Sequence, residues 1–116
     1  MRRVYDDSMY SKTSAEITKL LYAIRPAEVS EYIWSMDRVR PGLIRGYLEA
    51  RLPVKFGRNE DASGIGNNNA LQIIVKNGAE EQICGLLHLT DDMFGGVYAW
   101  VSDIDGGRKT QTRHIR

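Results

Sequence analysis

Three short apolar runs follow one another in the second half of the chain, and they constrain the fold more than any other feature. The runs cover residues 71–76, 83–89 and 97–101 and are rich in β-branched and aromatic side chains. Asn77-Gly78 separates the first two runs, and this pair favours the positive φ angles of a tight hairpin turn. Aspartates and glycines separate the last two. The pattern predicts a three-stranded antiparallel meander.

The first half of the chain predicts helices. Thr13 and Glu16 have the spacing of a capping box, which would start a helix at about residue 14. Pro26 lacks an N–H group and should end or kink that helix, so we expect two helices or one kinked helix over 14–37. The helical spacing of the first segment rests on Ile17, Leu20, Leu21 and Ile24.

A further helix is expected between Pro41 and Pro53. Residues 57–69 are rich in glycine and asparagine and predict a flexible loop, and residues 106–116 predict a flexible, basic, solvated tail. Taken together, the elements indicate one domain over residues 1–116. Its expected fold class is α+β, with N-terminal helices packed on one face of an antiparallel β-meander.

The composition excludes several classes of protein. A chain of 116 residues with a net charge of +1 is neither a strongly basic nucleic-acid protein nor a DNA mimic. Its single cysteine, Cys84, allows no internal disulfide, and in an apolar run we expect a buried, inert thiol. No apolar run approaches the roughly 20 residues of a membrane span. We therefore expect a cytoplasmic protein that does not bind membranes.

Two groups of side chains are candidates for binding. Tyr98 and Trp100 would share one face of a strand and could pack in a core or interface, or stack on bases. Arg108, Lys109 and Arg113 bring positive charge to the tail, where phosphate contact is an alternative to simple solvation.

No catalytic or metal-ligating set is evident. Gly106-Gly107-Arg108 fails the P-loop pattern but could bind an anion through backbone N–H groups. His88 is expected to be a half-exposed strand residue, because its nearest acids lie in a turn. The aspartates near residues 91 and 103 match no Ca²⁺ loop, so we expect no metal.

One segment resembles a known family. The run Ile24-Arg25-Pro26-Ala27-Glu28-Val29-Ser30-Glu31 is similar to the junction between the first two helices of GNAT-type acetyltransferase domains, above all the tailed-bacteriophage versions that include internal virion protein A. Residues 83–87 resemble the third strand of that fold, which often carries a central glycine. Residues 97–103 resemble the fourth. The order of elements agrees from about residue 4 to 103.

The resemblance covers only the front half of that fold. In catalytic members, a Q/R-x-x-G-x-G/A loop at a helix N-terminus holds the pyrophosphate of CoA. Only Gly106, Gly107 and Arg108 stand at the corresponding place, so the resemblance does not imply acetyl transfer. It does suggest a phage-encoded protein whose helix junction exposes Arg25, Glu28 and Glu31.

Three functions follow as expectations. The first is a small, non-catalytic protein-binding module, either a virion component or a modulator of a host protein, in the virion or the host cytoplasm. The second is a minimal N-acyltransferase that binds acetyl-CoA. The third is a nucleic-acid binder that uses the basic tail. Self-association through a sheet edge or through the Tyr98 and Trp100 face also stays open.

Overall fold

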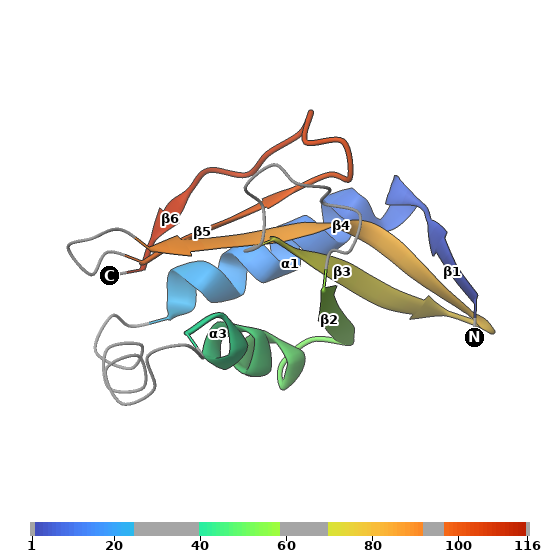
Figure 1. Cartoon of the computed structure of the whole chain (residues 1–116), viewed down its shortest axis with the longest axis horizontal. Coiled ribbons are helices and arrows are strands. Elements are labelled where there is room, and N and C mark those ends of the chain that lie inside the picture. The colour runs from blue at the N-terminus through green and yellow to red at the C-terminus, as the bar shows by residue number, and fades with distance from the viewer. Residues whose placement is uncertain (1, 25–39, 59–69, 92–96, 116) are drawn as a thin grey trace.

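A long strand, β4 (Glu80–Asp91), is the centre of the sheet in the computed structural model, which describes residues 2–24, 40–58, 70–91 and 97–115 (Figure 1). The sheet runs in the order β2-β3-β4-β5-β6, and β1 pairs with β4 outside this path. The other strands are β1 (Arg2–Tyr5), β2 (Val54–Arg58), β3 (Ala70–Asn77), β5 (Val97–Ser102) and β6 (Arg113–His114). The helices are α1 (Tyr10–Ala23) and α3 (Arg40–Glu49). The predicted α+β class is confirmed.

The predicted meander is present as β3, β4 and β5, each slightly longer than its apolar run. Asn77 pairs with Glu80, so the turn between β3 and β4 has Gly78 and Ala79 at its centre. Only Gly78 has a positive φ, at 63°, which fits a II′ turn with glycine in its first central position. Asn77 is therefore the last residue of β3 and not a turn residue with positive φ.

One edge of β4 is shared by two strands. Residues 86–91 pair antiparallel with β5, whereas residues 80–83 pair in parallel with β1. Only Cys84 and Gly85 lie between these two ladders. The sequence analysis left residues 1–12 as a strand or a loose arm, and it did not foresee the parallel pairing.

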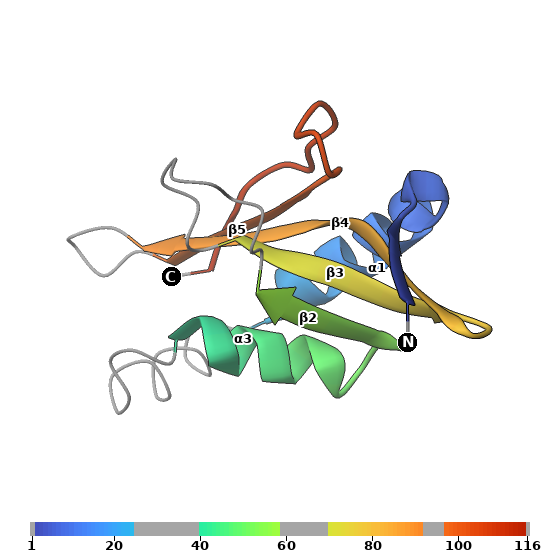
Figure 2. The same cartoon turned by 45° about the vertical axis from the view of Figure 1, so that its right-hand side comes forward.

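Both helices pack on the same face of the sheet (Figures 1 and 2). The core joins α1, α3 and the sheet, and its fully buried side chains include Ile17, Leu21, Leu48, Phe56, Leu87 and Val101. The core residues of β4 and β5 alternate along the strands, so one face of each strand is covered by helices: Leu87 and Leu89 on β4, and Val97, Ala99 and Val101 on β5.

The predicted capping box is wrong. The helix α1 begins at Tyr10, which leaves Thr13 buried inside its first turns. A 3₁₀ turn over Asp7–Met9 precedes it, and Asp6 caps that turn by accepting a 2.9 Å hydrogen bond from the Ser8 N–H. The earlier start makes Tyr10 the first residue of the helix, and its side chain is buried in the core.

Two segments expected to be irregular are ordered parts of the sheet. Gly57 and Arg58, the first residues of the predicted loop 57–69, belong to β2, and residues 59–69 lie outside the described part. The predicted solvated tail pairs with β5 instead: Thr110 N–H donates to the Val101 carbonyl at 2.8 Å, and Ile115 is fully buried. Backbone hydrogen bonds to β5 and the buried side chain of Ile115 together hold this polar segment on the sheet.

The second helix expected after Pro26 lies outside the described residues. Within the part of the chain that the structure describes, no helix has the length and apolar character needed to cross a membrane.

The close packing at Gly85 predicts that adding a single methyl group there will destabilise the fold. A Cβ at this position would lie 2.7 Å from the Ser102 carbonyl oxygen and 3.2 Å from the Tyr10 ring. We expect Gly85→Ala to lower the free energy of unfolding by about 1–3 kcal/mol, because backbone must move to admit it. Gly46→Ala is the matched control: nothing lies within 4 Å, and in an exposed helix it should stabilise by about 0.5–1 kcal/mol. Urea unfolding measures both, and equal effects would contradict the close approach.

Candidate functional site

The sheet face opposite the helices carries two stacked pairs of rings, which we call the aromatic strip: His88, Tyr98, Trp100 and His114. In the β4–β5 ladder His88 lies opposite Trp100, and in the β5–β6 ladder Tyr98 lies opposite His114. The rings of His88 and Trp100 are parallel within 1° at a centroid distance of 4.8 Å. Those of Tyr98 and His114 lie 4.6 Å apart at 14°. Tyr98 and Trp100 are partly exposed, and His114 is exposed.

His88 is the buried member of the strip. Its Nε2 lies 2.7 Å from Ser102 Oγ, and Ser102 also donates to the Asp103 carbonyl at 2.9 Å. If the serine proton is used in that second bond, His88 Nε2 must be the donor to Ser102. Burial lowers the pKa of His88, and the positive charge of Lys109 lowers it further, so the ring is neutral at pH 7.

The expectation of a half-exposed His88 is wrong, since only 8% of the residue is exposed. Trp100 stacks on the His88 ring and Ser102 contacts its Nε2, and sequence reasoning had placed neither residue beside it. The pair has the atoms of a Ser–His dyad, but it does not present a nucleophile. Ser102 is 1% exposed, and His88 Nδ1 has no hydrogen-bond partner in the described part of the chain to orient the ring.

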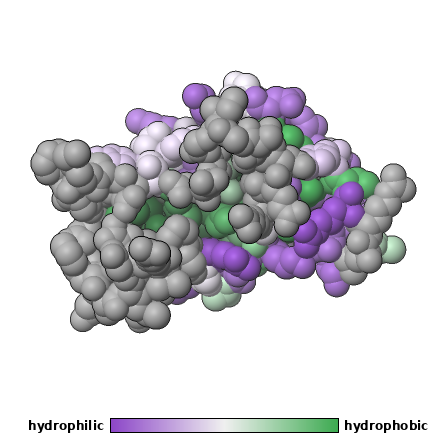
Figure 3. All heavy atoms as spheres, in the orientation of Figure 1, coloured by the Kyte–Doolittle hydropathy of each residue, from purple (hydrophilic) through white to green (hydrophobic). Residues whose placement is uncertain are grey.

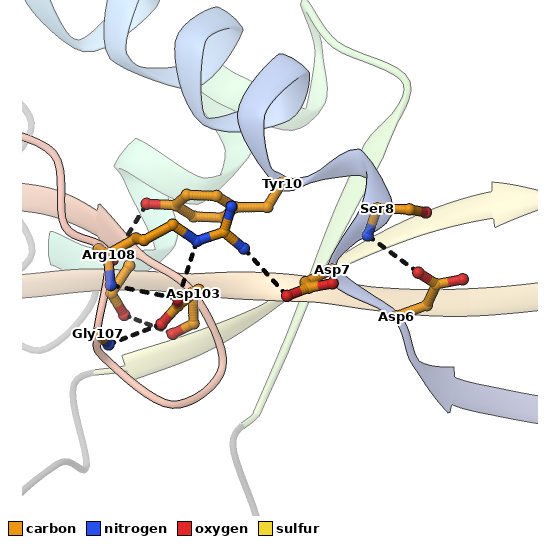
Figure 4. Close-up of polar contacts among 8 residues, drawn as sticks. Asp6, Asp7, Ser8, Tyr10, Asp103, Gly107 and Arg108 are labelled. Carbon is orange, nitrogen blue, oxygen red and sulfur yellow. Dashed lines mark hydrogen bonds and ion pairs between the residues drawn. The ribbon is translucent and has the colours of Figure 1, made fainter.

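Arg108 joins the two strands that share the β4 edge (Figure 4). Its NH2 group donates to Asp7 at 3.0 Å, next to β1, and its Nε donates to Asp103 at 3.1 Å, just after β5. The guanidinium also lies 4.6 Å from the centre of the Tyr10 ring, whose hydroxyl donates to the Arg108 carbonyl at 3.2 Å. The side chain is therefore engaged within the fold.

The glycine-rich turn beside Arg108 already holds an anion of its own. The Asp103 carboxylate accepts from the Gly107 N–H at 2.8 Å and from the Arg108 N–H at 3.2 Å. Burial alone would raise the pKa of Asp103, but these bonds and the Arg108 side chain outweigh it and lower the pKa. Gly106 supplies the turn with a φ of 76°. A phosphate at this turn would have to displace Asp103.

The structure separates the predicted tail residues. Arg108 belongs to the Asp7–Asp103 cluster, while Lys109 is exposed next to Ser102, with which it forms an isolated bridge. Arg113 turns towards α1, with its guanidinium 5.1 Å from the centre of the Tyr22 ring. Arg25, Glu28 and Glu31 lie outside the described residues.

The register of strands explains what sequence reasoning missed. His88 and Ser102 meet only because His88 faces Trp100 across the β4–β5 ladder, and Asp7 meets Arg108 across a separation of 101 residues. A hairpin register could in principle have been used to find the first pair; no local signal indicates the second.

Among the described residues, no cluster of His, Cys, Asp or Glu could hold a metal ion. Cys84 is fully buried, and burial raises the pKa of its thiol, as expected for an inert cysteine.

Comparison with protein families, curated proteins and solved structures gives no match for this chain. The GNAT resemblance therefore stays a prediction. The order of strand, helices and strands that suggested it is present, but many α+β folds share this order.

The buried, neutral His88 predicts a loss of stability in mild acid. Its pKa is lower in the folded chain than its ordinary value of about 6.5, so the unfolded chain binds the extra proton first. The free energy of unfolding is not reduced by His88 above about pH 6.5, and it falls as the pH drops towards the pKa that His88 has in the folded chain. His88→Gln keeps a hydrogen-bond donor near Ser102. In this variant the melting temperature should depend less on pH between about pH 7.5 and 5. The exposed His114→Gln is the control, and a slope that persists in His88→Gln would contradict the assignment.

The contacts of Arg108 should stabilise the fold in a way that another positively charged residue cannot reproduce. Arg108→Lys keeps the positive charge but cannot bond Asp7 and Asp103 together while covering the Tyr10 ring. We expect a lower melting temperature, measured by circular dichroism. Lys109→Ala, at the exposed neighbouring position, should change it little. Equal melting temperatures for the two variants would show that Arg108 does not tie β1 to β5.

Proposed function

We propose that this chain is a non-catalytic protein-binding domain and that the aromatic strip is its docking surface. The observation that carries the proposal is the pair of ring stacks that lie next to each other on one sheet face. Tyrosine and tryptophan are enriched among the residues that dominate binding energy in protein interfaces. Here both are partly exposed and lie at neighbouring positions of β5 that face the same side.

Stacking adds to the argument because it fixes the rings before a partner arrives. Trp100 is held against His88, and His88 is held by Ser102. Side chains that are already ordered lose less conformational entropy on binding. A partner would therefore meet a preformed surface.

The setting of this binding belongs to the same proposal: a phage-encoded virion component, or a modulator of a host protein, with a GNAT-like front half. It is supported by the sequence resemblance alone. The acyltransferase alternative is less well supported, because Asp103 uses the N–H groups of Gly107 and Arg108 that a CoA phosphate would need. Nucleic-acid binding by the tail is also weakened, since the side chains of Arg108 and Arg113 are engaged within the fold.

The test is affinity capture from a bacterial lysate with the tagged chain, followed by mass spectrometry. Trp100→Ala should lose at least about 10-fold of a retained partner, whereas Tyr22→Ala, an exposed aromatic on α1, should not. Trp100→Phe keeps an aromatic ring against His88 and should recover part of the binding. If Trp100→Ala retains its melting temperature and the full amount of partner, the aromatic strip is not the docking surface.

A further inference from the structure

The other end of this sheet face, beside the β3–β4 turn, gathers cations around one carboxylate. Glu81 lies 3.1 Å from Lys55 Nζ and 3.6 Å from Arg3 Nε. Lys76 pairs with Glu81 in the β3–β4 ladder, so its side chain leaves the sheet on the same face. On this face of the described strands, three cations and one acid therefore lie at this end, because Glu80, the acid next to Glu81 on β4, points to the opposite face.

The Glu81 carboxylate holds cations in place but does not neutralise their total positive charge. A hydrogen bond from Lys55 leads the causes that lower the pKa of Glu81, so the group stays ionised at neutral pH. Glu81 has little exposed surface, whereas the side chains of Lys55 and Arg3 are 56% and 45% exposed. Their charged groups therefore face solvent over a buried counter-charge, with a surplus of positive charge.

An exposed aromatic ring lies next to the cations. Tyr5 is two residues from Arg3 on β1 and is 53% exposed. Its hydroxyl accepts from Gln72 Nε2 on β3 at 3.5 Å, and a Cβ on Gly57 of β2 would lie 3.9 Å from an Arg3 guanidinium nitrogen. The β1 side chains thus reach over the sheet towards β3 and β2. Figure 3 shows hydrophilic and hydrophobic surface side by side at this end of the view.

We propose that this basic end, formed by Arg3, Tyr5, Lys55 and Lys76, binds single-stranded nucleic acid. Lysine and arginine neutralise phosphates, and an exposed aromatic ring stacks on a base of any sequence. A single strand offers both groups, whereas a duplex keeps its bases stacked internally. An acidic protein segment would use the cations but would have no base to place on Tyr5.

This site is separate from the aromatic strip and does not depend on the proposed protein partner. It also differs from the tail, because its four residues come from β1, β2 and β3.

The first measurement is fluorescence anisotropy with a labelled oligo(dT) of about 12 nucleotides, a length within the range that single-strand binding folds contact. With three cations on phosphates, the logarithm of the binding constant should fall against the logarithm of salt with a slope of about −2. Lys76→Gln should weaken binding and reduce that slope by about 0.7. Lys12→Gln and Lys19→Gln remove the same charge from exposed positions of α1 and should leave both unchanged.

The second measurement separates stacking from charge. Tyr5→Leu should weaken oligo(dT) binding about 5-fold or more, and Tyr5→Phe, which keeps the ring, should not. A duplex of the same length should bind more weakly than the single strand. The proposal is overturned by absence of binding at low salt or by equal losses in the α1 controls. It is also overturned if a poly-glutamate peptide competes fully while Tyr5→Leu has no effect, which would indicate an acidic protein ligand.

Discussion

The hydrogen-bonded ladders of β4 hold the described structure together. On one side β4 pairs with β3, and on the other it pairs first with β1 and then with β5. The change of partner occurs at Cys84 and Gly85, where the ladder to β3 is also irregular. The absence of a side chain at Gly85 lets the Ser102 backbone and the Tyr10 ring approach β4 there. The helices, the Arg108 cluster and the aromatic strip all depend on this arrangement.

Electrostatic interactions in this chain are mostly local and internal. Asp103 accepts from the turn that follows it, Arg108 connects Asp103 to Asp7, and Glu81 lies between Arg3 and Lys55. Exposed ion pairs contribute little energy each, but the pair between Arg108 and Asp7 joins segments that are far apart in the sequence. A net charge near zero therefore conceals a basic end and a neutral aromatic end on the same sheet face.

The sequence predicted what local periodicity can encode. The meander was correct because its three strands carry long apolar runs, and the start of α3 was correct because Pro41 marks it. The strand β2 was missed because it is short and contains Gly57, which weakens a strand pattern.

The functional surfaces were less accessible to sequence reasoning. Tyr98 and Trp100 were found because they alternate on one strand, but their histidine partners come from other strands. Arg108 was expected to be free because nothing near it in sequence announces Asp7. The basic end was missed for the same reason: Arg3 and Lys76 both pair with Glu81, and Arg3 does so through a parallel pairing that no local pattern specifies.

The parallel pairing of β1 has a consequence for how the chain folds. Residues 2–5 leave the ribosome before their hydrogen-bond partners at residues 80–83, which are made almost 80 residues later. Closing so long a loop is slow compared with forming the β3–β4 hairpin, whose strands adjoin in sequence. The strand β1 is therefore expected to be among the last to join the sheet, and Arg3 and Tyr5 reach their final positions only when it does.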